Sequence, residues 1–257
     1  MSEPILDLKH LNKSFGPVHV LHDVDFSVRP GQVTALVGDN GAGKSTLVKC
    51  IAGIHPSDSG TVSFAGDQVH IRGPKDAAEL GIEVVYQDLA LADNLDIVQN
   101  MFLGRERGNS WLLDEASMEK AARETLASLS VRTVKSVRTP VSALSGGQRQ
   151  TVAIAKSVLW ESKVVLLDEP TAALGVAQTR QVLDLVRRLA EQGLGVVLIS
   201  HNMADVFEVA DRIAVLYLGR LVADVATKDV THGQVVELIT AGRSGDLGLA
   251  RPEAVAL

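Results

Sequence analysis

A glycine-rich segment near the start of the chain has the composition of a phosphate site. It matches the pattern G-x-x-x-x-G-K-S, follows the apolar run 35–37 and precedes a helix-like stretch, 46–52. Glycines let the backbone wrap closely round phosphate oxygens, and a helix N-terminus adds roughly half a positive charge. We expect Lys44 to pair with the β- and γ-phosphates of a nucleotide and the Ser45 hydroxyl to bind Mg²⁺. The alternative is a glycine-rich turn that binds nothing.

This segment, residues 38–46, is called the phosphate loop below. Its expected nucleotide contacts are Gly38, Asn40, Gly41, Gly43, Lys44, Ser45 and Thr46.

Two adjacent carboxylates follow a second apolar run, Val164 to Leu167. Four apolar residues in a row indicate a buried strand, and the carboxyl end of such a strand is where open α/β sheets bind ligands. We expect Asp168 to bind Mg²⁺, directly or through water, because Mg²⁺ keeps several waters. Alternation along the strand turns Glu169 the other way, towards a water, as the general base. A solvated turn is the alternative for this pair.

The elements that must position these residues are those of an α/β protein. Short β-branched runs alternate with longer segments of helical period, which is typical of a mostly parallel sheet covered by helices. Expected core strands are Val33 to Val37, Glu83 to Tyr86, Val164 to Leu167, Val196 to Ile199 and Ile213 to Tyr217. Further strands, expected as an antiparallel β-layer beside this core, are Ile5 to Asn12, Val18 to Val28 and Thr61 to Ile71.

One domain with an inserted part is the expected organisation of all 257 residues. Residues 1–88 and 161–241 form the core with its β-layer, and 89–160 form a helical subdomain in which Asp114 to Leu129 and Gly147 to Trp160 are helices. Residues 242–257 are expected to be a frayed tail.

Composition excludes several classes of protein. A hydrophobic share of 46% with ordinary glycine and proline content excludes disorder, collagen and coiled coil. A formal net charge of −6 excludes a strongly basic nucleic-acid binder. The single cysteine, Cys50, cannot form an internal disulfide. The N-terminus lacks the pattern of a signal peptide, and no apolar run approaches the ~18 residues of a membrane span, so we expect a soluble intracellular protein.

The peptide Leu144-Ser145-Gly146-Gly147-Gln148 lies between the two motifs, and with them it resembles the signature of the ATP-binding-cassette (ABC) ATPases. The serine and the glycine backbone open a helix, so the peptide could itself bind phosphate. The resemblance implies an ABC-type P-loop ATPase that uses ATP and Mg²⁺. It also implies that Ser145 and Gly147 meet the γ-phosphate held by a second subunit, which gives a homodimer with ATP at its interface.

Other positions match the family in order along the chain. Gln87 resembles the glutamine that contacts Mg²⁺ or the lytic water, and His201 resembles the histidine that touches the γ-phosphate. Phe15 falls where the family stacks an aromatic ring on adenine, although a phenylalanine facing the core is the alternative. Taken alone, a glutamine or histidine at a strand end would be an ordinary satisfied polar residue.

One position departs from the family pattern. Gly175 stands where an aspartate usually ends the loop after the acidic pair, which puts coupling between subunits through this loop in doubt. The peptides 169–176 and 199–208 are most similar to ATPases of bacterial monosaccharide importers of the ribose, xylose and fructose group.

The similarity implies the ATPase of a sugar importer, peripheral on the cytoplasmic side of the membrane. Its partners would be a permease and a sugar-binding protein, with no nucleic acid. An exporter ATPase and a soluble ABC ATPase outside transport are the alternatives, and the sugar itself is not encoded in this chain.

The segment after Gln87 carries more apolar residues than a short connector needs. We expect some of them to line a permease-docking groove, and packing inside the helical subdomain is the alternative. They are Leu89, Leu91, Leu95, Ile97, Met101, Phe102 and Leu103.

Overall fold

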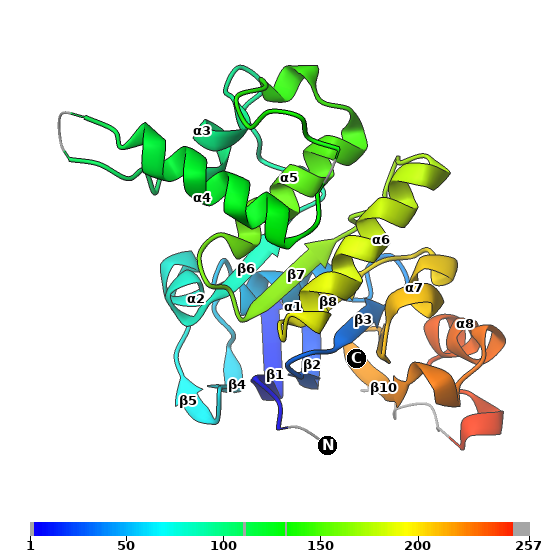
Figure 1. Ribbon diagram of the computed structural model, residues 1–257. Coiled ribbons are helices and arrows are strands. Elements are labelled where there is room, and N and C mark those ends of the chain that lie inside the picture. The colour runs from blue at the N-terminus through cyan, green and yellow to red at the C-terminus, as the bar shows by residue number, and fades with distance from the viewer. Residues whose placement is uncertain (1–2, 110–111, 132, 249–257) are drawn as a thin grey trace.

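The computed structural model describes residues 3–109, 112–131 and 133–248 (Figure 1). Residues 1 and 2 and residues 249–257 of the expected tail lie outside the described residues. Within the described ranges, no helix has both the length and the apolar character needed to cross a membrane.

The core sheet has the strand order β10-β9-β3-β8-β7-β6. All neighbouring pairs from β9 to β6 are parallel, and β10 pairs with β9 in the antiparallel sense. The bounds are β3 Val33–Val37, β6 Ile82–Val85, β7 Val164–Asp168, β8 Gly195–Ile199, β9 Arg212–Tyr217 and β10 Arg220–Ala226. The α/β prediction is confirmed, and each expected core strand is found within about one residue of its predicted ends. The edge strand β10 was not predicted.

The two faces of this sheet belong to different hydrophobic cores. Leu36 and Leu166 pack with helix α1, Lys44–Ile51, and the β-layer. The alternate residues Ala35, Val165 and Leu167 pack towards the helices on the opposite side. Because successive side chains of a strand point to opposite faces, a strand buried on both sides reads as an unbroken apolar run. This explains why the sequence pattern located these strands so closely.

The expected antiparallel β-layer is present, with one correction. Its order is β2-β1-β4-β5, with bounds β1 Leu6–Phe15, β2 Val18–Val28, β4 Ser59–Phe64 and β5 Asp67–Val69. The single strand predicted from Thr61 to Ile71 is a hairpin, because the chain reverses at Ala65 and Gly66. Both residues have positive φ, 52° and 91°, as a tight hairpin turn requires.

Helices surround the two sheets. Those of the core are α1 Lys44–Ile51, α2 Pro74–Leu80, α6 Val176–Glu191, α7 Met203–Val209 and α8 His232–Ala241, and the 3₁₀ helix η2 spans Thr227–Asp229. The described chain between β6 and β7 holds α3 Ile97–Phe102, α4 Glu115–Ser128, the 3₁₀ helix η1 Val141–Ala143 and α5 Gly146–Val158. Figure 1 shows this part, in green, standing above the edge of the core sheet.

Two of the helices between β6 and β7 were predicted from sequence. Helix α4 matches the segment expected from Asp114 to Leu129, with Asp114 as the N-cap that accepts a bond from the Ser117 N–H. Helix α5 begins after Ser145, the N-cap in a reciprocal pair with Gln148, and ends two residues short of the predicted limit at Trp160.

Three of the seven apolar residues expected to form a docking groove are packed instead. Ile97, Met101 and Phe102 are at most 1% exposed in the core shared with α4 and α5, so the groove interpretation is wrong for them. Leu89 and Leu91 are half-buried against the same core. These side chains pack in the hydrophobic core that the helical part shares with the sheet.

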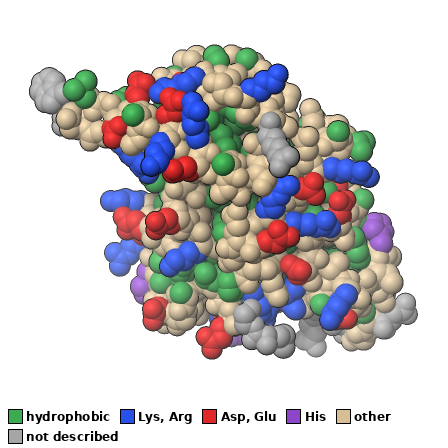
Figure 2. All heavy atoms as spheres, viewed as in Figure 1, with side chains coloured by type: hydrophobic (Ala, Val, Ile, Leu, Met, Phe, Trp, Pro, Cys, Tyr) green, Lys and Arg blue, Asp and Glu red, His purple; other side chains and the backbone are tan. Residues whose placement is uncertain are grey.

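A network of charges ties the helical part together. Arg138 contacts Asp96, Glu115 and Glu119 at 3.3, 3.1 and 2.8 Å, which joins the N-termini of α3 and α4 to the segment before η1. Figure 2 shows acidic and basic side chains close together over this part of the molecule.

The start of the expected tail is ordered rather than frayed. Gly242 ends α8 with φ 68° and lies against the Tyr217 ring, where a Cβ would come within 2.4 Å of a ring carbon. Ser244 is buried and the 3₁₀ helix η3, Gly245–Leu247, follows it. The contact of Gly242 with Tyr217 of β9 holds this segment against the core. Sequence periodicity carries no signal for such a contact, so the sequence did not predict it.

Candidate nucleotide site

The predicted site residues of the sheet lie together at the carboxyl ends of its parallel strands. The phosphate loop follows β3, His201 follows β8, Asp168 and Glu169 lie at the end of β7, and Gln87 follows β6. These four strands are neighbours and run parallel, so their carboxyl ends lie on the same side. The sheet topology thus brings together residues that are up to 163 positions apart in the sequence.

The phosphate loop requires glycine for reasons that the structure shows directly. At Gly38, φ is 157° and a Cβ would lie 2.3 Å from the Leu216 carbonyl oxygen. At Gly43, φ is 105° and a Cβ would approach Leu21 of β2 at 2.9 Å. Gly43 is also the N-cap of α1 and no side chain caps this helix, so its first N–H groups are available to an anion.

Lys44 folds back over the phosphate loop. Its Nζ donates to the carbonyl oxygens of Gly38 and Asp39 at 2.7 and 3.0 Å, which uses two of its three protons. Burial lowers the pKa of the ammonium, and the negative charges of Glu169, Asp39 and Asp168 act in the opposite direction. The ammonium therefore lies in the field of both acids at the end of β7.

The surroundings of the Asp168 carboxylate favour a nearby cation. Burial, and then the charge of Glu169, raise the pKa of its carboxyl, whereas Lys44 and Lys49 act to lower it. In the described part of the chain its carboxylate accepts no hydrogen bond from another residue, so an additional positive charge would be favourable there.

Glu169 and His201 are directly hydrogen-bonded to each other. The distance from His201 Nδ1 to Glu169 Oε1 is 2.7 Å, with the glutamate side chain 16% exposed and the histidine 76% exposed. Glu169 has a φ of 51°, so it leaves the strand direction that alternation assumed. With Nδ1 held by the carboxylate, Nε2 is left to face the solvent side of the site.

A buried acid that the sequence did not single out joins the two segments that carry this pair. Asp205, 5% exposed, accepts from the Thr171 hydroxyl at 2.6 Å and from the Asn202 side-chain amide at 3.0 Å. It thereby ties the segment after β7 to the segment after β8. No local motif marks Asp205, because Thr171 is 34 positions away and an aspartate in the first turn of a helix, three residues after Asn202, is common.

Phe15 does not face the core. It ends β1, is 42% exposed and pairs with Val18 across the β1–β2 turn. Leu21 and the Val20 carbonyl of the same hairpin touch the phosphate loop at Gly43, so the aromatic ring lies on the hairpin that packs against this loop.

The signature residues form a second group. Ser145 caps α5, and its N–H donates to Gln148 Oε1 at 2.9 Å. Gly147 lies against the Gln178 side chain of α6, at 3.0 Å from the position of a Cβ. Among the described residues, no hydrogen bond joins Ser145 or Gly147 to the phosphate loop of the same chain.

Gly175 occupies a position that an aspartate could take. It is the N-cap of α6 with extended backbone, φ −76° and ψ 162°, and the nearest atom to a Cβ there is Gln178 Oε1 at 3.9 Å. Glycine at this position has no side chain to accept the first N–H groups of α6.

We expect Gly175→Asp to fold and to raise the free energy of unfolding by about 0.3–1 kcal/mol, because an acid both caps a helix and favours its positive end. Thermal melting measures the change. Gly175→Ala is the matched control, which adds a Cβ without an acceptor and should melt below Gly175→Asp. A lower melting temperature for Gly175→Asp than for the alanine variant would contradict the N-cap assignment.

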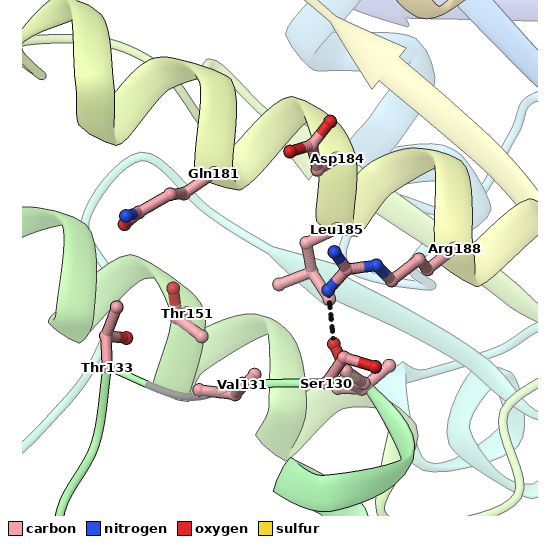
Figure 3. Close-up of a pocket in the computed structure, with 9 residues that line it drawn as sticks. Ser130, Val131, Thr133, Thr151, Gln181, Asp184, Leu185 and Arg188 are labelled. Atoms are coloured by element: carbon pink, nitrogen blue, oxygen red, sulfur yellow. Dashed lines mark hydrogen bonds between the residues drawn. The ribbon is translucent and has the colours of Figure 1, made fainter.

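A cavity of about 370 Å³ lies beside the signature residues, between α6 and the segment that joins α4 to α5. Of its lining residues, Thr151 donates to the Gly147 carbonyl at 2.8 Å and the Thr133 carbonyl accepts from the Gln148 side chain at 2.7 Å. Figure 3 shows Gln181 and Arg188 on the α6 wall opposite Thr133 and Thr151. Arg188 donates to the Leu129 carbonyl at 2.8 Å across it, which fixes the end of α4 to the core.

Comparison with known proteins agrees with this geometry. The ABC transporter family pattern matches residues 21–172. The fructose import ATP-binding protein FrcA of Rhizobium meliloti is 46% identical over 248 residues, covering 94% of this chain and 95% of that protein. The xylose/arabinose import ATP-binding protein XylG of Sulfolobus acidocaldarius is 43% identical over 245 residues, covering 95% and 97%.

A solved structure has the same fold. The nucleotide-free ATP-binding cassette of an ABC transporter superposes with a TM-score of 0.79 at 25% identity, covering 87% of this chain and 92% of that one. The expected P-loop fold and the resemblance drawn from the signature are confirmed. The chain therefore belongs to the ABC transporter family, as one of its ATP-hydrolysing subunits.

Proposed function

We propose that this protein is the ATP-binding subunit of a sugar importer, in which ATP hydrolysis drives monosaccharide uptake through a membrane permease. The single observation that carries the proposal is 46% identity over nearly the full length of a fructose import ATP-binding protein. Its place would be on the cytoplasmic face of the membrane, bound to the permease, with a sugar-binding protein on the other side. The cargo within the monosaccharide class would be selected by those partners.

The site residues fit a nucleotide with Mg²⁺. The proposed metal ligands, Ser45, Gln87 and Asp168, offer oxygen atoms of the kind that Mg²⁺ prefers. The raised pKa of Asp168 and its lack of a hydrogen-bond partner in the described chain fit a nearby cation. When bound, Mg²⁺ neutralises charge on the β- and γ-phosphates.

The chain's own residues would do the remaining work. Lys44 and the N–H groups at the start of α1 bind phosphate oxygens, while Phe15 stacks on the adenine. Glu169 accepts a proton from the attacking water, and His201, held through Nδ1, directs Nε2 towards the γ-phosphate.

The separation of Ser145 and Gly147 from the phosphate loop supports a shared site. Gly147 lies against Gln178 in the first turn of α6, and Ser145 caps α5. A phosphate held at the phosphate loop would therefore reach the N-terminus of α5 from a second molecule. We therefore infer a homodimer with ATP between the phosphate loop of one subunit and the signature of the other.

The chain would act as a single ATPase domain with a movable part. Residues 1–88 and 161–241 would hold the nucleotide, and the helical part 89–160 would turn relative to them when Gln87 senses the γ-phosphate. After the correction for buried side chains, the candidate permease contacts are Leu89, Leu91, Leu95 and Leu103.

Uptake measurements test the proposal. The chain, co-expressed with the permease and binding protein encoded beside it, should support ATP-dependent uptake of labelled fructose, ribose or xylose into vesicles. Leu103→Asp, at a leucine that is 46% exposed, should retain folding and ATPase activity and lose co-purification with the permease. Leu112→Asp, at a leucine that is 73% exposed, is the control. ATPase activity with outward transport and no uptake would support the exporter alternative instead.

A further inference from the structure

The Phe15 ring is held by residues from a different part of the chain. His55 lies against it with ring centroids 5.1 Å apart and an angle of 78° between the planes, the edge-to-face arrangement that aromatic pairs prefer. The Lys13 ammonium lies over the ring, 5.3 Å from its centroid. With these contacts in place, 42% of Phe15 remains exposed.

Both neighbours are themselves fixed. Lys13 is only 9% exposed, and its Nζ donates to the Pro56 carbonyl and to Asp58 Oδ1, each at 2.8 Å. The other carboxylate oxygen of Asp58 accepts from the Ser14 N–H at 2.6 Å. These bonds lower the pKa of the Asp58 carboxyl, so it stays ionised at neutral pH. The end of β1 and residues 52–58, which we call the α1–β4 loop, are thus locked together.

The α1–β4 loop is the direct continuation of the phosphate-binding helix. The N–H groups of Ile54 and His55 both donate to the Lys49 carbonyl in the last turn of α1, at 2.9 and 3.1 Å. The first turn of α1 carries Lys44. One eight-residue helix therefore connects the phosphate end of the site to the residues that hold Phe15.

The arrangement has the features of a preformed stacking surface. The Phe15 ring is partly exposed to solvent and is held in place by His55 and Lys13. Because the ring is already fixed, it loses little conformational entropy when a planar base stacks on it. The same hairpin contacts the phosphate loop at Gly43. A base that stacks on Phe15 would thus belong to the nucleotide whose phosphates lie at α1.

We infer that His55, with Lys13 and Asp58, is a positioning residue that holds Phe15 as a preformed platform for the purine base. The inference rests on the proposed nucleotide site and adds to it that base affinity depends on the α1–β4 loop. His55 acts through Phe15 and does not touch the reacting atoms.

The test compares ligands with and without a base. His55→Ala should raise the KM for Mg·ATP by about 2- to 10-fold, the worth of one aromatic pair, with kcat unchanged. Affinity for Mg²⁺-tripolyphosphate, which has phosphates and no base, should not change in titration calorimetry. His55→Tyr should restore the wild-type KM, and His70→Ala, at an exposed histidine directly after β5, is the matched control.

Phe15→Ala distinguishes the positioning role of His55 from base stacking on Phe15 itself. If Phe15→Ala weakens ATP binding and His55→Ala does not, the positioning role of His55 is overturned and the nucleotide site stands. If neither variant alters ATP affinity, the purine platform itself is wrong. Equal loss of ATP and tripolyphosphate affinity in His55→Ala, or a fall in kcat, would show a general structural role and also overturn the inference.

Discussion

Lys44→Ala should lose tight ATP binding. The ammonium is the side-chain cation held at the centre of the phosphate loop, and hydrogen bonds to charged groups contribute about 1.5–3 kcal/mol. Affinity for Mg·ATP should therefore fall by at least about 10- to 100-fold, with hydrolysis falling in parallel. Titration calorimetry on the purified chain measures the effect.

A control must separate this loss from a change of net charge. Lys75→Ala also removes one positive charge, but from an 88% exposed side chain in the first turn of α2. The Mg·ATP affinity of this variant should match wild type. Circular dichroism checks that both variants fold. A folded Lys44→Ala protein with wild-type Mg·ATP affinity would refute the phosphate-loop assignment.

Glu169→Gln should bind ATP normally and hydrolyse it about 10²- to 10⁴-fold more slowly, the usual contribution of a general base. The amide keeps the size of the side chain and can still bond to His201 Nδ1, so the variant removes basicity with little change of geometry. Because ATP then persists, a nucleotide-bound dimer should accumulate. Single-turnover kinetics and size-exclusion chromatography with Mg·ATP measure the two effects.

The matched control is Glu191→Gln, at an exposed glutamate that ends α6, which should behave as wild type. His201→Ala should also slow hydrolysis more than binding, because it removes the partner that orients Glu169. Near wild-type hydrolysis by Glu169→Gln, together with a protein that stays monomeric in Mg·ATP, would contradict both the base and the shared site.

The sequence by itself determined the parts of this protein that depend on neighbours along the chain. The phosphate loop was predictable because its glycines, its lysine and its flanking strand and helix are consecutive. The core strands were predictable because burial on both faces produces unbroken apolar runs. The cap of α5 at Ser145 follows from a four-residue pattern.

The tertiary structure decided everything that depends on which surfaces meet. It set the bond between Glu169 and His201, the bond of buried Asp205 to Thr171 and the contact of His55 with Phe15. It also placed Phe102 in the core rather than in a groove. Each of these pairs residues from different elements, so the local periodicity of either partner is the same whether or not they touch. Strand order and packing between layers supply that information, because they choose which of many compatible faces is buried against which.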